Sequence, residues 1–200
     1  MTVWSYKISR DFGFAPNPFF GFCTVACCKP NIREGAKVGD LVFGCAAKSL
    51  KIGEVLIFAM RVEEKLTFDQ YWRDVRFSKR RPAFRAGRAR MYGDNIYHSD
   101  GAGHWTQEDS HHSLDGGGWN EANASRDLNS KFVLVARDFS YWGDKAIEIA
   151  PHLRNFEGDD LYPQVRNLRN SYSPAMQTAA NIWFDSLPKG RCGRPLNWDD

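Results

Sequence analysis

A polar, glycine-rich stretch from Ser78 to Ser130 separates two parts of the chain that are rich in apolar residues. A region of this length without a regular apolar pattern is uncommon inside a compact domain and usually has a function. Only short strands, near Tyr92 to His98, are expected within it. The fold must therefore be built from the segments before and after this stretch, and several candidate functional residues lie inside it.

The flanking segments predict mainly β-strands. Residues 2–9 alternate between apolar and polar positions, as a half-buried strand does. Further strands are predicted in FCTVAC (22–27), after the turn at Gly39-Asp40, in GEVLIFAMRVEEKL (53–66) and in KFVLVARDFSYWG (131–143). The unbroken apolar centre of residues 53–66 indicates one long strand that is buried on both faces.

Short helices are predicted between and after these strands. NIREGA (31–36) allows a single turn, and Thr67 and Gln70 have the spacing of a capping box. Ser173-Pro174 begins an amphipathic helix that ends before Pro188. Together the elements predict an α+β fold with a mostly antiparallel sheet that is curled or closed into a barrel. We expect a single domain over residues 1–200, in which residues 151–200 form a helical extension.

The composition excludes several classes of protein. No apolar run approaches the roughly 20 residues that span a bilayer, and the N-terminus lacks the pattern of a signal peptide. We therefore expect a cytoplasmic protein without a membrane partner. The five cysteines are an odd number in a chain without an export signal, which favours reduced thiols over a disulfide framework.

Positive charge is concentrated in one segment, although the whole chain has a net charge of only +3. Between Arg73 and Arg90, eight basic residues accompany the single acid Asp74. Such a segment attracts phosphate groups, whereas a solvated surface or internal ion pairs would give the same pattern. The candidate phosphate-binding residues are Arg80, Arg81, Arg85, Arg88 and Arg90.

Residues 91–118 hold four of the five histidines, together with carboxylates and a glycine run. Their spacing matches no metal-binding motif, so no metal is predicted, and no particular cofactor is indicated. A histidine beside a carboxylate can act as a general acid or base near neutral pH, although a polar surface loop is the alternative for each histidine. The candidate catalytic residues are His98, His111, His112 and Asp109.

A thiol is a further candidate nucleophile. Cys23, Cys27 or Cys28 can form a thiolate pair with a histidine from residues 98–112. The spacing of the cluster CTVACC also allows buried free thiols, which are common in protein cores.

Aromatic and amide side chains indicate contact with a nucleobase. Aromatic rings can stack on or enclose a base, while amides and carboxylates read its polar edge. The candidate nucleotide-binding residues are Asn17, Lys29, Arg33, Asp94, Asn95, Tyr97, Gln107 and Trp142.

Four motifs in order carry a resemblance to a known family. They are GFAPNPFFGFCTVACCKPNIREGAKVGDLVFG (13–44), YGDNIYH (92–98), QEDSHHS (107–113) and FSYWG (139–143). Over residues 1 to about 150 the chain resembles the bacterial and phage family called nucleotide modification associated domain, type two. The resemblance implies an association with genes for modified DNA bases, in DNA modification or defence.

The order of elements is also similar to that of PUA-like domains, in particular their EVE and YTH-like branch. The similar features are the early strand, the segment NIREGAKVGDLVFG, the long strand VLIFAMRVEEKL, the helix TFDQYW and a late strand. This likeness implies a pocket with aromatic walls that binds modified bases. The histidine-rich insertion at residues 91–118 departs from that branch.

We therefore predict a protein that binds a nucleotide or a flipped base, including a modified one, in an aromatic pocket beside the basic segment. Its partner is nucleic acid, DNA rather than RNA, or a free nucleotide. The alternative is an enzyme that acts on the same substrate, a hydrolase, transferase or nuclease, with histidines as acid and base or as metal ligands. A third hypothesis is a partner protein of a larger modification complex.

Overall fold

The computed structural model describes residues 1–164 and 168–198, and the chain forms two compact units. Unit 1 comprises Met1–Asp11, Ala36–Glu63 and Ala136–Asp200, and unit 2 comprises Phe12–Gly35 and Glu64–Val135. The chain therefore passes from one unit to the other four times. Whether the two units together form the single domain that we expected depends on how they are joined. The single domain therefore stays a prediction.

Unit 1 is built on a mixed sheet in which the strand order is β11, β1, β3, β4, β9, β12, with β10 paired to β4. The strands are β1 Val3–Ile8, β3 Leu41–Ala46, β4 Val55–Arg61, β9 Phe139–Tyr141, β10 Ile147–Glu148, β11 Leu168–Arg169 and β12 Gly190–Arg191. β1 runs parallel to β3, and β12 runs parallel to β9, while the remaining pairs are antiparallel. Because β11 and β12 are edge strands, the sheet of the described residues is open and does not form the barrel that the sequence predicted.

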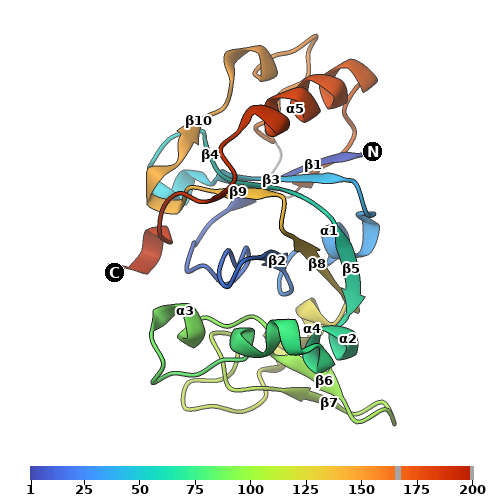
Figure 1. Ribbon diagram of the computed structural model, residues 1–200, viewed down its shortest axis with the longest axis vertical. Coiled ribbons are helices and arrows are strands. Elements are labelled where there is room, and N and C mark those ends of the chain that lie inside the picture. The colour runs from blue at the N-terminus through green and yellow to red at the C-terminus, as the bar shows by residue number, and fades with distance from the viewer. Residues whose placement is uncertain (165–167, 199–200) are drawn as a thin grey trace. The chain divides into compact units, whose positions relative to one another are not determined.

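Helix α5 Pro174–Ser186 lies along one face of this sheet (Figure 1). The side chain of its N-cap residue Ser173 accepts a hydrogen bond from the Met176 N–H, as the sequence pattern predicted for a helix start. Met176, Ala180 and Phe184 recur at helical spacing and are buried in the core of unit 1. Short 3-10 helices complete the unit: η1 Lys48–Leu50, η3 Gly143–Lys145, η4 Pro151–Leu153 and η5 Leu196–Trp198.

Unit 2 contains a three-stranded sheet, β2-β8-β5, and a two-stranded hairpin, β6-β7. The strands are β2 Cys23–Val25, β5 Glu64–Thr67, β6 Tyr97–Ser99, β7 Trp105–Gln107 and β8 Phe132–Ala136. The helices are α1 Pro30–Gly35, α2 Phe68–Arg73, η2 Val75–Arg80, α3 Arg88–Met91 and α4 Glu121–Asp127. Phe68, Tyr71, Phe77 and Tyr97 are fully or almost fully buried in its core.

Two segments that the sequence predicted as continuous strands are each divided between the units. Residues 53–66 form β4 in unit 1 and β5 in unit 2, and residues 131–143 contribute β8 and β9 to different sheets. At the first break the N–H of Val62 donates to the Asp40 carbonyl, and the carbonyl of Val62 accepts from the Gly39 N–H. Val62 thus still pairs with the turn before β3, and from Glu64 onward the chain pairs with β8 in the other sheet. The prediction of one long strand was therefore wrong.

Local capping signals account for the helix starts in unit 2. At α2 the predicted capping box is confirmed, because Thr67 accepts from the Gln70 N–H while the Gln70 side chain accepts from the Thr67 N–H. Helix α4 lies inside the polar stretch and was not predicted. Its sequence EANASRD has no apolar periodicity, but the side chain of Asn120 caps it by accepting from the Asn123 N–H.

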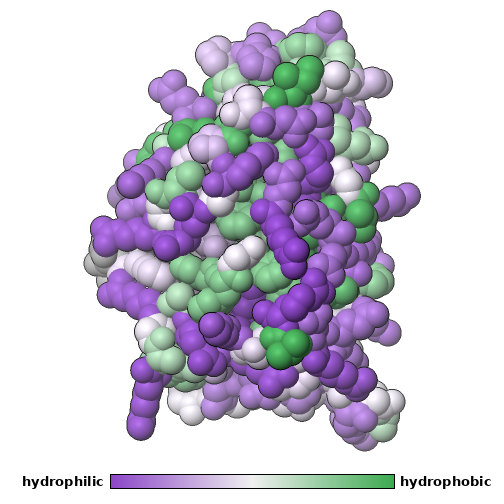
Figure 2. Space-filling view, in the orientation of Figure 1, coloured by the Kyte–Doolittle hydropathy of each residue, from purple (hydrophilic) through white to green (hydrophobic). Residues whose placement is uncertain are grey.

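Hydrophilic side chains cover most of the face seen in Figure 2, and hydrophobic side chains appear there in small groups. Among the helices that the structure describes, none is both long enough and apolar enough to cross a membrane.

Candidate active site

A tight turn between β2 and α1 presents the side chain of Cys28. Cys28 and Lys29 have φ values of 58° and 42°, a left-handed conformation that is costly for residues other than glycine. The Cys28 N–H donates to Asp127 Oδ1 at 2.8 Å, and its carbonyl accepts from Arg33 Nε at 2.8 Å. Cys28 is partly exposed, whereas the preceding Cys27 is buried. A strand, a strained turn and a helix also present the nucleophile in α/β hydrolases, which have a different fold.

Arg33 on α1 holds this turn in place. Its guanidinium is fully buried and donates to the backbone carbonyls of Cys28, Asp127, Ser130 and Phe132, at distances between 2.5 and 3.0 Å. A buried carbonyl group without a partner is costly, so one side chain satisfies four acceptors at once. Arg33 therefore ties the β2-α1 turn to the end of α4 and the start of β8.

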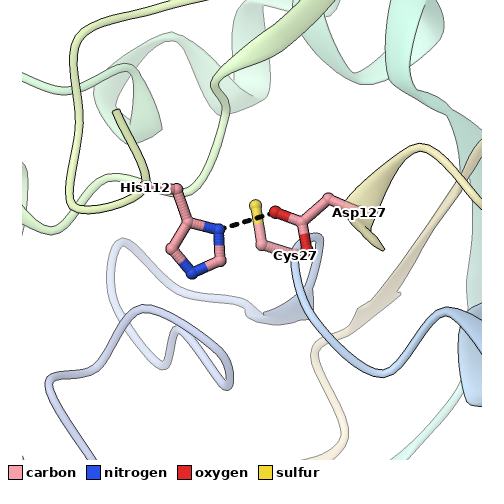
Figure 3. A group of neighbouring side chains, drawn as sticks. All are labelled: Cys27, His112 and Asp127. Atoms are coloured by element: carbon pink, nitrogen blue, oxygen red, sulfur yellow. Dashed lines mark hydrogen bonds and ion pairs between the residues drawn. The ribbon is translucent and has the colours of Figure 1, made fainter. Parts of the chain in front are cut away.

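His112 is held at one ring nitrogen by the carboxylate of Asp127, as the dashed line in Figure 3 marks. The distance from Nδ1 to Asp127 Oδ2 is 2.6 Å. The same oxygen accepts from the Tyr97 hydroxyl at 3.1 Å, and Tyr97 in turn accepts from Gln107 Nε2 at 2.8 Å. The backbone carbonyl of His112 accepts from Asn123 Nδ2 and Gln107 Nε2. Both the ring and the backbone of His112 are thus fixed by buried or partly buried groups.

The other ring nitrogen of His112 faces Cys28. The distance from Nε2 to the Cys28 sulfur is 3.7 Å, and the ring of Phe14 packs on the imidazole with 4.5 Å between ring centroids. A thiol, an imidazole and a carboxylate therefore follow one another in contact. This is the arrangement in which a base activates a nucleophile and a third group orients the base.

Electrostatics favour a charged imidazole at this position. Burial acts to lower the pKa of His112, but the hydrogen bonds to Asp127 and Cys28 outweigh it and raise the pKa to about 9. Burial likewise acts to raise the pKa of Asp127, but the hydrogen bond from His112 holds it below its ordinary value. At neutral pH the pair is an imidazolium and a carboxylate, so a positive charge lies beside the Cys28 sulfur.

Cys27 is a second thiol close to His112 and Asp127. Figure 3 shows its sulfur beside the Nδ1 edge of His112 and the carboxylate of Asp127, and one ligand atom from each of these three residues lies within 4.8 Å of the others. Burial raises the pKa of Cys27 well above its ordinary value, and the negative charges of Asp127 and Asp94 raise it further. The Cys27 thiol donates to the Asp94 backbone carbonyl at 3.7 Å. A metal binds the thiolate. The three residues thus have atoms of the kind that bind metals. However, the raised pKa of Cys27 favours the protonated thiol, and His112 and Asp127 already form an ion pair, so the group is better described as a structural thiol beside an ion pair.

The chain was also compared with known protein families. The family model described as nucleotide modification associated domain 2 matches residues 1–200. The chain belongs to this family. The match confirms the resemblance and extends it beyond residue 150 to the whole chain. No curated protein and no solved structure matched.

In this nucleotide modification associated domain, the four predicted catalytic residues occupy different places. His112 is part of the site just described. His98 stacks on Trp72 with 4.1 Å between ring centroids, and its Nε2 lies 2.9 Å from Glu108 Oε1. His111 is exposed and lies at the edge of Phe12, with 4.8 Å between centroids. The carboxylate of Asp109 is exposed and accepts from the Gly118 N–H at 2.7 Å.

Part of the predicted nucleotide-binding set is a buried network around Arg80. Its guanidinium is fully buried, donates to Asn17 Oδ1 at 2.9 Å, Thr24 Oγ1 at 2.7 Å and the Phe22 carbonyl at 2.7 Å, and lies 3.6 Å from Asp94. Asp94 also accepts from Thr24 and Tyr71. Arg80 is therefore unavailable to a phosphate in solution, contrary to our expectation, because it satisfies internal acceptors.

The remaining predicted nucleotide contacts are mostly structural in this arrangement. Tyr97, Gln107 and Arg33 hold residues of the candidate site in place, as described above. Asn95 is buried and donates from Nδ2 to the Tyr71 carbonyl at 3.1 Å. Lys29 is next to Cys28 and partly buried, and burial lowers its pKa. Trp142 is a buried core residue of unit 1.

The other predicted phosphate ligands divide by exposure. Arg81 lies over the ring of Trp72, with 3.9 Å to the centroid, and donates to the Trp72 carbonyl. Arg90 is half-buried. Arg85 and Arg88 have exposed side chains, so they are the two that remain suited to a phosphate.

Sequence reasoning did not identify Asp127 and did not choose among the three clustered thiols. Asp127 was missed because it ends helix α4, which has no apolar periodicity. A usable signal did exist for Cys28. It stands between a predicted strand and Pro30, a residue type favoured at the first position of a helix, so Cys28 occupies the turn between the two elements.

Proposed function

We propose that this chain is a thiol-dependent enzyme of nucleotide modification in which Cys28 is the nucleophile. One observation carries the proposal: the imidazole of His112 lies between the Cys28 sulfur at 3.7 Å and the Asp127 carboxylate at 2.6 Å. The family supplies the biochemical context, since its description associates it with nucleotide modification.

The geometry supports covalent catalysis in two steps. In the first, the Cys28 thiolate attacks an electrophilic carbon of a nucleotide or of a group attached to its base. The bond from that carbon to the leaving group breaks, and the leaving group takes the proton from His112 Nε2. In the second, water or an acceptor amine or hydroxyl loses a proton to His112 and displaces Cys28 as thiolate. Asp127 keeps the imidazole in the orientation and tautomer that both steps need.

The site favours an enzyme over a protein that only binds a base. Two consecutive non-glycine residues with positive φ are costly, and such strain is concentrated at functional sites. Base binding requires neither a strained cysteine nor an oriented imidazole. The aromatic rings of Phe12, Phe14 and Tyr92 pack on one another or on His111 and His112, so they help to position the histidines.

The proposal is tested by incubating the protein with a panel of nucleotides and with DNA that carries natural or modified bases. Liquid chromatography and mass spectrometry of the nucleosides should reveal a new product. Intact-protein mass spectrometry should reveal an adduct, and digestion should locate it on Cys28. We expect Cys28→Ser to abolish the adduct and to reduce turnover by about 10³-fold or more, as removal of a nucleophile does.

Cys27→Ser is the matched control, because it changes the neighbouring thiol and leaves Cys28 in place. This variant should keep the adduct. Full activity in Cys28→Ser, or a panel that gives neither product nor adduct, would refute the proposed function.

A further inference from the structure

A cavity of about 490 Å³ lies beside the loop that carries His112. This volume is within the range of about 300–1,000 Å³ that is usual for small-molecule sites. Ser110, His111 and Ser113 contribute to its wall and flank His112 in the sequence. The cavity wall also contains Phe84, Asp109, Leu114 and Asp115.

One carboxylate of the wall is fixed by the glycine run. Asp109 Oδ1 accepts from the Gly118 N–H at 2.7 Å. Gly117 has a φ of 98°, and a β-carbon at this position would lie 2.7 to 2.8 Å from the Asp109 carboxylate oxygens. The positive φ favours glycine at this position, and the absence of a side chain leaves room for the Asp109 carboxylate. The glycine run thus holds a hydrogen-bond acceptor in the cavity wall.

Two side chains of the wall present apolar surface that is accessible to a ligand. Phe84 is 56% exposed and Leu114 is 53% exposed, which is unusual for large apolar side chains. The cavity wall contains two carboxylates and no lysine or arginine. A complementary ligand has a flat apolar face and donates hydrogen bonds, and it does not place a phosphate inside the cavity.

We infer that this cavity is the nucleobase subsite of the Cys28 enzyme and that it selects bases with an exocyclic amino group. The link to catalysis rests on the proposed function. The Asp109 carboxylate accepts from the amino group, as acidic side chains do from the N4 amino group of cytosine. Phe84 contacts the face of the ring, and every nucleobase offers such a face. Thymine and uracil have a carbonyl oxygen in place of the amino group. This oxygen and the Asp109 carboxylate are both hydrogen-bond acceptors, so they repel each other and form no hydrogen bond.

Binding can be measured without turnover in the Cys28→Ser protein. Isothermal titration calorimetry with dCMP, dAMP and dTMP should show that dCMP or dAMP binds at least about tenfold more tightly than dTMP. Phe84→Ala should weaken binding of the preferred nucleotide by about tenfold, since a base that stacks on an aromatic ring loses this contact. Asp109→Ala should bring the affinities for the amino and oxo bases close together.

Phe20→Ala is the matched control, because Phe20 is another exposed phenylalanine of unit 2 that is not part of the cavity wall. It should leave all three affinities unchanged, and melting curves should show that both phenylalanine variants are folded. Equal affinities for dCMP, dAMP and dTMP, or an unchanged affinity in Phe84→Ala, would overturn the assignment of the cavity. Base selectivity without any Cys28 adduct would instead refute the proposed function and leave the cavity as the base site of a binding protein.

Discussion

The negative charge of Asp127 keeps His112 protonated, and Asp127→Asn should therefore reduce the reactivity of Cys28. The amide retains the shape of the carboxylate but not its charge. The pKa of His112 should then fall from about 9, because burial lowers it and the strongest opposing contact is weakened. Because His112 Nε2 lies 3.7 Å from the Cys28 sulfur, loss of this positive charge should slow alkylation of Cys28 by iodoacetamide at pH 7 by about tenfold. Mass spectrometry of the Cys28 peptide measures this rate.

Cys192 is an internal control in the same experiment, since it is a partly exposed thiol of unit 1. Its alkylation rate should be the same in the native protein and in Asp127→Asn. An unchanged rate at Cys28 would show that His112 does not set the reactivity of this thiol.

The raised pKa of His112 also predicts how stability depends on pH. The folded pKa of about 9 exceeds the ordinary value of 6.5, so protonated His112 stabilises the fold fully below pH 6.5. This contribution is lost as the pH rises through about 9, and it is at most on the order of 3 kcal/mol. It also falls at acidic pH, when Asp127 takes up a proton. The melting temperature of the native protein should therefore exceed that of His112→Gln most clearly near pH 6, and little at pH 10.

Individual residues of the site were predictable only where their chemistry is distinctive. His112 was among the candidate bases, and a thiolate paired with a histidine was among the hypotheses, because imidazole and thiol have few other chemical roles. Asp127 is one of many carboxylates in the chain, and its position depends on a tertiary contact. The internal use of Arg80 was not predictable either, because a buried arginine and a solvated one look alike in a basic run.

At the scale of elements, Arg33 joins α1 to the end of α4 and the start of β8, so Arg33→Met should destabilise unit 2 strongly. Methionine fills a similar volume but leaves four carbonyl groups without their donor. We expect a loss on the order of 3 kcal/mol or more in the free energy of unfolding, measured by urea denaturation. Arg33→Lys should recover only part of it, because an ammonium group lacks the planar fork of a guanidinium. The control is Arg73→Met on α2, where the arginine is exposed.

The elements themselves were largely predictable from local patterns, but their assignment to sheets was not. Alternating apolar residues indicated β1 and the apolar run indicated β4, and capping residues indicated the starts of α2 and α5. The same patterns do not show where a chain leaves one sheet for another. Both β4-β5 and β8-β9 were therefore predicted as single strands, although each pair is divided between two units.

At the scale of the whole molecule, the number of accessible cations limits how strongly salt can weaken binding to DNA. Of the five arginines predicted to bind phosphate, Arg85 and Arg88 are exposed, whereas Arg80 is buried in unit 2. The logarithm of the affinity for duplex DNA falls with the logarithm of salt concentration by about 0.9 for each phosphate contact. Fluorescence anisotropy at several salt concentrations should thus give a slope near −1.8 if these two arginines bind phosphates, and near −4.5 if all five do. The double variant Arg85→Gln, Arg88→Gln should remove most of the dependence, whereas Arg73→Gln should change it little. A slope near −4.5 that the double variant leaves largely unchanged would contradict the assignment of the phosphate contacts to Arg85 and Arg88.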